Sequence, residues 1–200
     1  NGDTALMSAV LTGNKEIVQL LIDAKADVNV INVKNNRHVS YTALMLAVGY
    51  DHTEIIQLLI DAKADVNLKN EDGYTALSFA AREGHKDIVQ LLIDAQADVN
   101  VKNKDGYTAL SFAAGSGFKE IVQMLLDANA YVNVKDQNGD TALMLATKKG
   151  DKEIVQMLID AKADVNVQNE NGHTALRWAG RNGHDEIVQM LNDYAKAPEL

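Results

Sequence analysis

The chain contains no cysteine, so neither a disulfide nor a thiolate metal site is available to it. Proline occurs once, and no apolar run approaches the roughly 18 residues that a membrane-spanning helix needs. The first residues, NGDTALMSAV, lack the basic and apolar regions of a secretory signal peptide. Together these absences predict a protein of a reducing, cytoplasmic compartment.

Positive charge is scarce as well. The sequence has 19 lysines and arginines against 28 acidic residues, which gives a formal net charge of −9. A phosphate backbone and an anionic membrane both attract positive charge, so this balance argues against nucleic acid and membrane surfaces as partners. The same balance suits a basic protein partner. Hydrophobic residues make up 46% of the 200, which is enough for a packed interior.

The sequence consists mainly of one repeated unit, which occurs about six times. Thr-Ala-Leu occurs six times, at Thr4, Thr42, Thr75, Thr108, Thr141 and Thr174. The last five copies are spaced by 33 residues, and the first gap is 38 residues. An Ile-Val or Ile-Ile pair follows each copy 13 residues later, at Ile17, Ile55, Ile88, Ile121, Ile154 and Ile187. A fixed pitch of this size predicts a stacked repeat protein, in which each unit buries its apolar face against its neighbours.

The unit at residues 70–102, NEDGYTALSFAAREGHKDIVQLLIDAQADVNVK, shows the expected local structure. Asp72-Gly73 is typical of a tight turn, and Thr75 is placed to cap a helix through its hydroxyl. Small apolar residues follow and predict a short helix that ends at the Gly-His pair. A second, strongly apolar helix has Asp87 in its first turn, where a negative charge suits the helix dipole. The unit is therefore predicted to be turn, helix, turn, helix and extended arm.

Three motifs recur in register: D-G-x-T-A-L-x-x-A-A, then G-H-x-[DE]-I-V-x-x-L-L, then A-D-V-N. With them the chain resembles the ankyrin repeat family over essentially its whole length. The resemblance implies an all-α solenoid of helix-turn-helix units with short β-hairpin arms, in a single domain over 1–200. Its repeats would cover about 1–31, 37–69, 70–102, 103–135, 136–168 and 169–200, with a five-residue insertion at about 32–36.

Several positions depart from the family pattern. Ala replaces the usual Pro at the start of each first helix, and Met, Ser or Arg replaces the His two residues later, so coupling between repeats is expected to rest on apolar packing. The usual Gly after the second helix is replaced by Lys25, Lys63, Gln96, Asn129 and Lys162. If these residues keep the left-handed conformation of a glycine cap, each is strained by roughly 1 kcal/mol.

The two ends and the insertion are less regular. The first repeat has the apolar pattern of an internal repeat, so we expect further repeats before it, a bare face, or a face buried against a partner. The last repeat, with Leu191-Asn192-Asp193, looks more like a cap. The insertion, VINVKNNRHVSYT at 30–42, predicts an extended hairpin tip rather than a disordered bulge, because Val and Ile favour extended chain.

The candidate binding residues follow from the resemblance, which implies that hairpin tips and first helices line a concave, protein-binding face. The residue before each capping Thr should point onto this face, which selects Tyr41, Tyr74, Tyr107, Asp140 and His173. Tyrosine is common at interfaces because it offers a large rigid ring with a polar tip. The first helices add Tyr50, Phe79, Arg82, Phe112, Lys148, Trp178 and Arg181. The alternative for the phenylalanines is ordinary packing between repeats.

No pattern of catalysis or metal binding emerges. His52, His85 and His184 recur in the turn between helices, there is no H-E-x-x-H, and the acidic residues of the second helices are periodic, as on a solvated face. The Asn of each Val-Asn step is expected to make structural hydrogen bonds. Gly115-Ser116-Gly117 lacks the spacing of a phosphate loop. We therefore expect no catalytic residues, no metal and no cofactor, and the chain is predicted not to be an enzyme.

The leading hypothesis is a monomeric, non-catalytic module that binds a partner protein through its concave face. Trp178, with Arg177 and Arg181, forms a small basic and aromatic patch that is a candidate contact site. Two alternatives stay open at this point. One is a structural or engineered scaffold with no specific partner, and the other is a regulatory fragment of a larger protein.

Overall fold

The structure is a computed structural model that describes residues 2–32 and 40–196. These residues form twelve α-helices and contain no β-strand. The chain divides into two compact units, Asn1–Lys104 and Asp105–Leu200, and each unit holds three helix pairs. The prediction of helix-turn-helix repeats is confirmed. The arms, which were expected to be β-hairpins, are turns and extended chain among the described residues.

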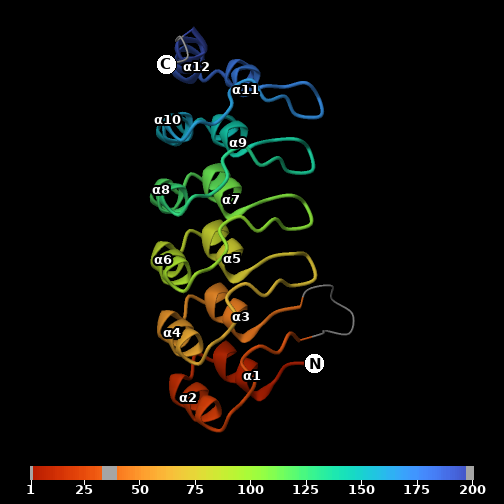
Figure 1. Ribbon diagram of the computed structural model, residues 1–200, viewed down its shortest axis with the longest axis vertical. Helices are drawn as coiled ribbons and strands as arrows, with labels where there is room; N and C mark the ends of the chain where they lie inside the picture. The colour runs from red at the N-terminus through yellow and green to blue at the C-terminus, as the bar shows by residue number, and fades with distance from the viewer. Residues whose placement is uncertain (1, 33–39, 197–200) are drawn as a thin grey trace. The chain divides into compact units, whose positions relative to one another are not determined.

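The first unit consists of three consecutive pairs, which are α1 (Ala5–Leu11) with α2 (Lys15–Asp23), α3 (Ala43–Gly49) with α4 (Thr53–Asp61), and α5 (Ala76–Glu83) with α6 (Lys86–Asp94). Within this unit α3 packs against α1 and α5, and α4 packs against α2 and α6. The arms project on the side of the first helices (Figure 1). The first helices and the arms of this unit therefore share one face.

The second unit repeats this arrangement with α7 (Ala109–Ser116) and α8 (Lys119–Asp127), α9 (Ala142–Lys149) and α10 (Lys152–Asp160), and α11 (Ala175–Asn182) and α12 (Asp185–Lys196). Here α9 packs between α7 and α11, and α10 packs between α8 and α12. None of the helices in the described residues is long and apolar enough to cross a membrane.

The first helix of each repeat begins where the sequence predicts. In all six repeats the threonine before this helix is its N-cap, and its hydroxyl accepts the backbone N–H three residues on. In α5 the bond is reciprocal, because the Ser78 hydroxyl also accepts the N–H of Thr75. Such caps satisfy backbone donors that would otherwise lack a partner at the helix start.

The second helices of the first five repeats are followed by a left-handed residue that is not glycine. The φ angles are 65° at Lys25, Lys63 and Gln96, 63° at Asn129 and 67° at Lys162, which confirms the predicted conformation. At the end of α4, the N–H of Lys63 donates to Ile60 and the N–H of Ala64 donates to Leu59, both at 2.9 Å. This is the bond pattern of a Schellman motif. A non-glycine residue with a strained backbone conformation therefore occupies a position at which glycine is preferred.

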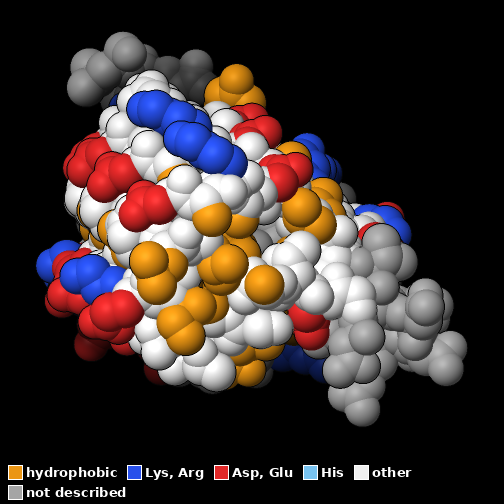
Figure 2. Space-filling view, turned by 90° about the horizontal axis from the view of Figure 1, so that it is seen from below, with side chains coloured by type: hydrophobic (Ala, Val, Ile, Leu, Met, Phe, Trp, Pro, Cys, Tyr) orange, Lys and Arg blue, Asp and Glu red, His pale blue; other side chains and the backbone are white. Residues whose placement is uncertain are grey.

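The core of each unit lies between successive repeats. Where a repeat of the same unit precedes it, the isoleucine in the first turn of the second helix is 2% exposed or less, at Ile55, Ile88, Ile154 and Ile187. Its counterpart in the first repeat, Ile17, is 46% exposed, and Leu20 on the same helix is 66% exposed. Figure 2 shows apolar side chains gathered on the outer face of the first repeat. An isoleucine at this position is therefore buried by the repeat before it, not by its own.

Hydrogen bonds from an asparagine side chain also join successive repeats, at the ends of the first, second and fourth repeats. The Asn29 side-chain oxygen accepts the N–H of Asp65 at 2.7 Å, and Asn67 accepts the N–H of Asp98 at 2.7 Å. In the second unit Asn133 accepts from Asp164 at 2.8 Å. The prediction that these asparagines make structural hydrogen bonds is confirmed, and in these three cases the partner is the backbone of the next repeat.

The insertion begins and ends on an ordinary arm. The Asn32 N–H donates to the Tyr41 carbonyl at 3.0 Å, and its side-chain oxygen accepts the Tyr41 N–H at 2.6 Å. In the third repeat the same two bonds link Asn70 to Tyr74. The prediction of an extended tip falls mainly on residues 33–39, which lie outside the described residues, so it stays a prediction.

The strained caps give a direct test. Lys63→Gly should raise the free energy of unfolding by about 1 kcal/mol, because glycine adopts a positive φ without the clash of a Cβ atom. Lys63→Ala keeps the Cβ and removes the same charge, so it should give no gain. Urea unfolding of the three proteins measures both changes. A gain shared equally by the two variants would show that removal of the lysine charge, not backbone strain, is responsible.

Candidate functional site

The arms are organised by a buried Asn or Asp at their start. In the first unit, the side-chain oxygen of Asn70 accepts the N–H of Asp72 at 3.0 Å and of Tyr74 at 2.9 Å. In the second unit Asp136 and Asn169 make the same pair of bonds. Such short polar side chains are suited to closing turns onto their own backbone. Sequence reasoning missed this role, although the recurrence of Asn or Asp at this position could have indicated it.

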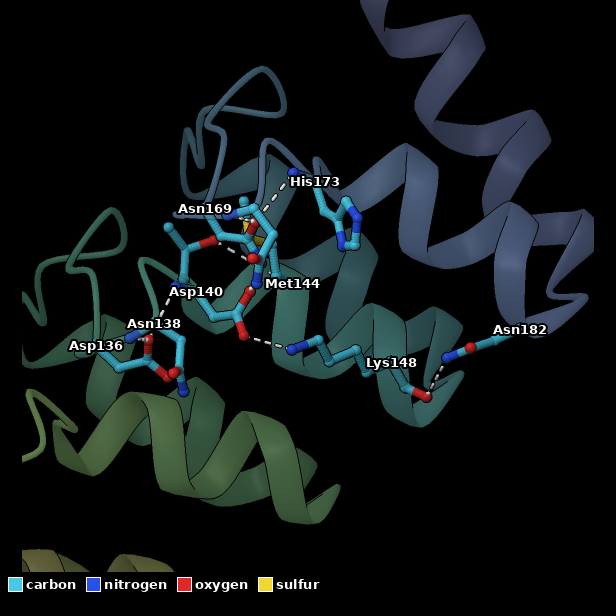
Figure 3. Close-up of polar contacts among 10 residues, drawn as sticks. Asp136, Asn138, Asp140, Met144, Lys148, Asn169, His173 and Asn182 are labelled. Carbon is cyan, nitrogen blue, oxygen red and sulfur yellow. Dashed lines mark hydrogen bonds and ion pairs between the residues drawn. The ribbon is translucent and has the colours of Figure 1, made fainter.

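One of the candidate residues, Asp140, lies inside this framework. Its side chain is 4% exposed, and Asn169 of the next arm donates to its Oδ1 at 2.8 Å. Its Oδ2 is paired with the Lys148 ammonium from α9 (Figure 3). Both carboxylate oxygens therefore have partners within the second unit. Asp140 therefore holds the next arm and Lys148 in position.

Where the same position carries tyrosine, the side chain stacks. The Tyr74 ring lies 5.1 Å from the Phe79 ring at an interplanar angle of 21°, and the Tyr41 ring lies 5.8 Å from the same phenylalanine, which is buried. Tyr74 precedes the capping Thr75, and Phe79 is the fourth residue of α5. Contact between these two positions is a hydrophobic staple, which fixes how the chain enters the helix. The stack therefore has a structural role of its own.

A cation completes this first cluster. The Arg82 guanidinium lies 5.4 Å from the Tyr74 ring centre and 5.3 Å from the Phe79 ring centre, distances typical of cation–π contacts. Glu83 holds the same guanidinium at 2.9 Å. Burial raises the pKa of the Tyr41 hydroxyl, while the charge of Arg82 acts to lower it. We call Tyr41, Tyr74, Phe79 and Arg82 the first aromatic cluster.

The second unit has an equivalent stack. Tyr107 and Phe112 lie 5.1 Å apart at 18°, again from the positions of a staple. Burial raises the pKa of the Tyr107 hydroxyl, and the negative charge of Asp136 and a hydrogen bond to it raise the pKa further. The phenol is therefore neutral at physiological pH and keeps its proton for hydrogen bonding.

The last repeat uses the same two positions for His173 and Trp178. Their rings are 5.0 Å apart and meet edge to face at 85°. The Lys148 ammonium lies 4.2 Å from the Trp178 ring centre, and the Arg181 guanidinium lies 5.5 Å from it. Asn182 also donates to the Lys148 carbonyl at 3.1 Å (Figure 3). We call Lys148, His173, Arg177, Trp178 and Arg181 the Trp178 cluster.

The electrostatics of this cluster are set by its cations. Desolvation lowers the pKa of His173, and the neighbouring charges of Arg177 and Arg181 lower the pKa further, while Asp140 opposes them. The imidazole is therefore neutral near pH 7. The Nδ1 atom of His173 and the Nε1 atom of Trp178 are both buried without a hydrogen-bond partner among the described residues.

The remaining candidate, Tyr50, lies apart from these stacks. It follows the end of α3 and is 57% exposed, and its ring is stacked on His52 at 6.0 Å in the turn to α4. The His52 and His184 rings lie against the backbones of Gly13 and Gly150, so both serve contacts between repeats. Gly117, from the glycine-rich turn, ends α7 in the left-handed conformation. The described residues contain no group of three or more His, Asp or Glu that could hold a metal ion.

A family model described as Ankyrin repeats (3 copies) matches residues 1–70, 44–136 and 129–198. Because these matches span nearly the whole sequence, the chain belongs to the ankyrin repeat family, whose fold is a helical solenoid. The family is non-catalytic, in agreement with the prediction that the chain is not an enzyme, and it generally serves in protein–protein interaction. A comparison with curated proteins finds no match.

The lowered pKa of His173 predicts a pH dependence. Because the folded protein favours the neutral imidazole, its contribution to stability is complete above the ordinary pKa of about 6.5 and is lost as the pH falls from that value through the lowered pKa of the folded state. Arg177→Gln should raise the pKa of His173, whereas Arg82→Gln in the other unit should leave it unchanged. An NMR titration of the imidazole measures the midpoint. A wild-type midpoint at or above the ordinary value would contradict the account.

Proposed function

We propose that this ankyrin repeat chain binds a partner protein through the faces that its first helices share with its arms. The observation that carries the proposal is the set of aromatic pairs on these faces, Tyr74 with Phe79, Tyr107 with Phe112 and His173 with Trp178. Each pair is held by its own helix start before any partner arrives. The rings are therefore pre-organised.

Pre-organisation matters because ordering a side chain on binding costs roughly 0.5–1.5 kcal/mol per flexible residue. The stacked rings have lost that freedom already, so little further ordering is needed. Tyrosine, tryptophan and arginine are also the residues most enriched among the energetic centres of protein interfaces. Arg82 beside Tyr74 in the first unit, and Arg181 beside Trp178 in the second, place such residues together.

The formal net charge of −9 supports a partner that is basic over most of its contact surface. The acidic residues of the second helices are exposed, as Asp61, Asp94 and Asp127 show. Such charges act at long range and mainly raise the rate of association. The aromatic clusters would then supply the short-range contacts that decide affinity.

The proposal is tested by removing two tyrosines from the stacks. Tyr74→Ala/Tyr107→Ala should lose proteins that the wild-type chain retains from a lysate of its source cells, because the rings supply much of the contact area. The matched control is Tyr131→Ala/Tyr194→Ala, which removes two exposed tyrosines outside the stacks and should retain the same proteins as wild type. Quantitative mass spectrometry of the retained fractions compares the three proteins.

Thermal melts of both double variants establish that the comparison is between folded proteins, because loss of the staples lowers stability somewhat. Equal recovery of every protein by wild type and by Tyr74→Ala/Tyr107→Ala would remove the tyrosines from the proposal. The absence of any protein retained by wild type would favour the alternative of a scaffold with no specific partner.

A further inference from the structure

The surface of α11 differs in charge from the rest of the chain. The helix, ALRWAGRN, carries two arginines and no acidic residue, within a chain whose formal net charge is −9. Arg177 and Arg181 are four residues apart, which places them on the same face of a helix with about 5–6 Å between their Cβ atoms. Both side chains are exposed. The local charge at this face is therefore opposite to that of the whole chain.

The arginines at this face are not neutralised by the nearby carboxylate. Asp140 is buried and takes its bonds from Lys148 and Asn169. Among the described residues, neither Arg177 nor Arg181 forms an ion pair with an acidic side chain. Lys148 is half-buried and lies over Trp178, so its charge adds to the field at the ring even though Asp140 offsets part of it. The positive charge of the two arginines is thus available to a ligand.

Two polar atoms in the same cluster also lack a protein partner. Trp178 Nε1, which is always a donor, and His173 Nδ1 are buried without a hydrogen bond among the described residues. A buried donor without an acceptor costs roughly 1–3 kcal/mol. Because both atoms are buried, a ligand at this face would meet the exposed Arg177 and Arg181 side chains and not these two atoms. The cluster therefore offers a ligand the positive charge of two exposed arginines beside an aromatic ring.

We propose that the Trp178 cluster binds an acidic segment of the partner protein, an inference that rests on the proposed function. Arginine recognises carboxylates through paired, charge-assisted hydrogen bonds. In an extended peptide, side chains two residues apart lie on the same side at about 6.6–6.8 Å, close to the spacing of two arginines on one helix face. The segment that fits carries carboxylates at alternate positions, such as Glu-Ser-Glu. Nucleic acid is disfavoured because the rest of the chain is acidic.

The only tryptophan of the chain reports on this site directly. The full chain is titrated with a peptide of alternating Glu and Ser, up to about 1 mM, while the emission of Trp178 is recorded. A matched peptide with Gln in place of Glu has the same length and polarity without charge. The Glu peptide should change the emission to saturation, and the Gln peptide should leave it unchanged. Equal responses to the two peptides would overturn the proposal.

Two variants locate the binding. Arg177→Gln/Arg181→Gln should weaken the affinity for the Glu peptide by about tenfold or more, because both charge-assisted contacts are lost. Lys15→Gln/Lys86→Gln makes the same change in net charge on the second helices of the first unit, and it should alter affinity by less than about twofold, as expected for exposed charges outside the Trp178 cluster. Equal weakening by both variants would show that net charge alone attracts the peptide, and would overturn the proposal.

A single-stranded oligonucleotide of similar charge distinguishes the two classes of anionic ligand. It should bind more weakly than the Glu peptide, and tighter binding would contradict the assignment to an acidic protein segment. Failure of the Glu peptide to bind leaves the tyrosine test of partner capture unaffected, because that test does not use the Trp178 cluster. The two proposals can therefore fail separately.

Discussion

The rest of the structure depends on burial between successive repeats. A helix pair of this length has an apolar face that it cannot cover by itself, so the neighbouring repeat must cover it. Ile55 is 2% exposed where a repeat precedes it, whereas Ile17, the same residue at the same position of the first repeat, is 46% exposed. The fixed pitch of the sequence follows from this requirement, because only units of equal length keep the matching faces in register. The asparagine bonds between repeats, such as Asn67 to Asp98, reinforce that register.

The same helix starts that hold each repeat together also present its surface. Thr75 caps α5, and Tyr74 and Phe79 on either side of that cap stack as a staple. The stack leaves the Tyr74 ring half-buried and fixed, which is the state that favours binding at low entropic cost. At the equivalent position Asp140 instead ties one arm to the next. One position in the repeat therefore either stiffens the framework or presents an aromatic ring, according to the residue that occupies it.

Much of the fold could be predicted from the sequence, because its determinants are local. The threonine caps, the two helices and the left-handed Lys63 each follow from a few neighbouring residues. The candidate site could be predicted only in part. Asp140 and Tyr74 share a repeat position, and Asp140 is hydrogen-bonded to Asn169, 29 residues away. The clustering of Lys148 over Trp178 likewise joins two repeats. Such contacts depend on how neighbouring arms pack, which local patterns do not encode.

The most direct test of this account compares two identical substitutions in the first unit. Ile55→Ala should lower the free energy of unfolding by about 2–4 kcal/mol, because it leaves a cavity in a packed interface. Ile17→Ala should lower it by less than about 1 kcal/mol, because that side chain is already half in water and its loss leaves little cavity. Urea unfolding of both variants beside wild type provides the measurement. Equal losses for the two substitutions would contradict the claim that burial between successive repeats holds the fold.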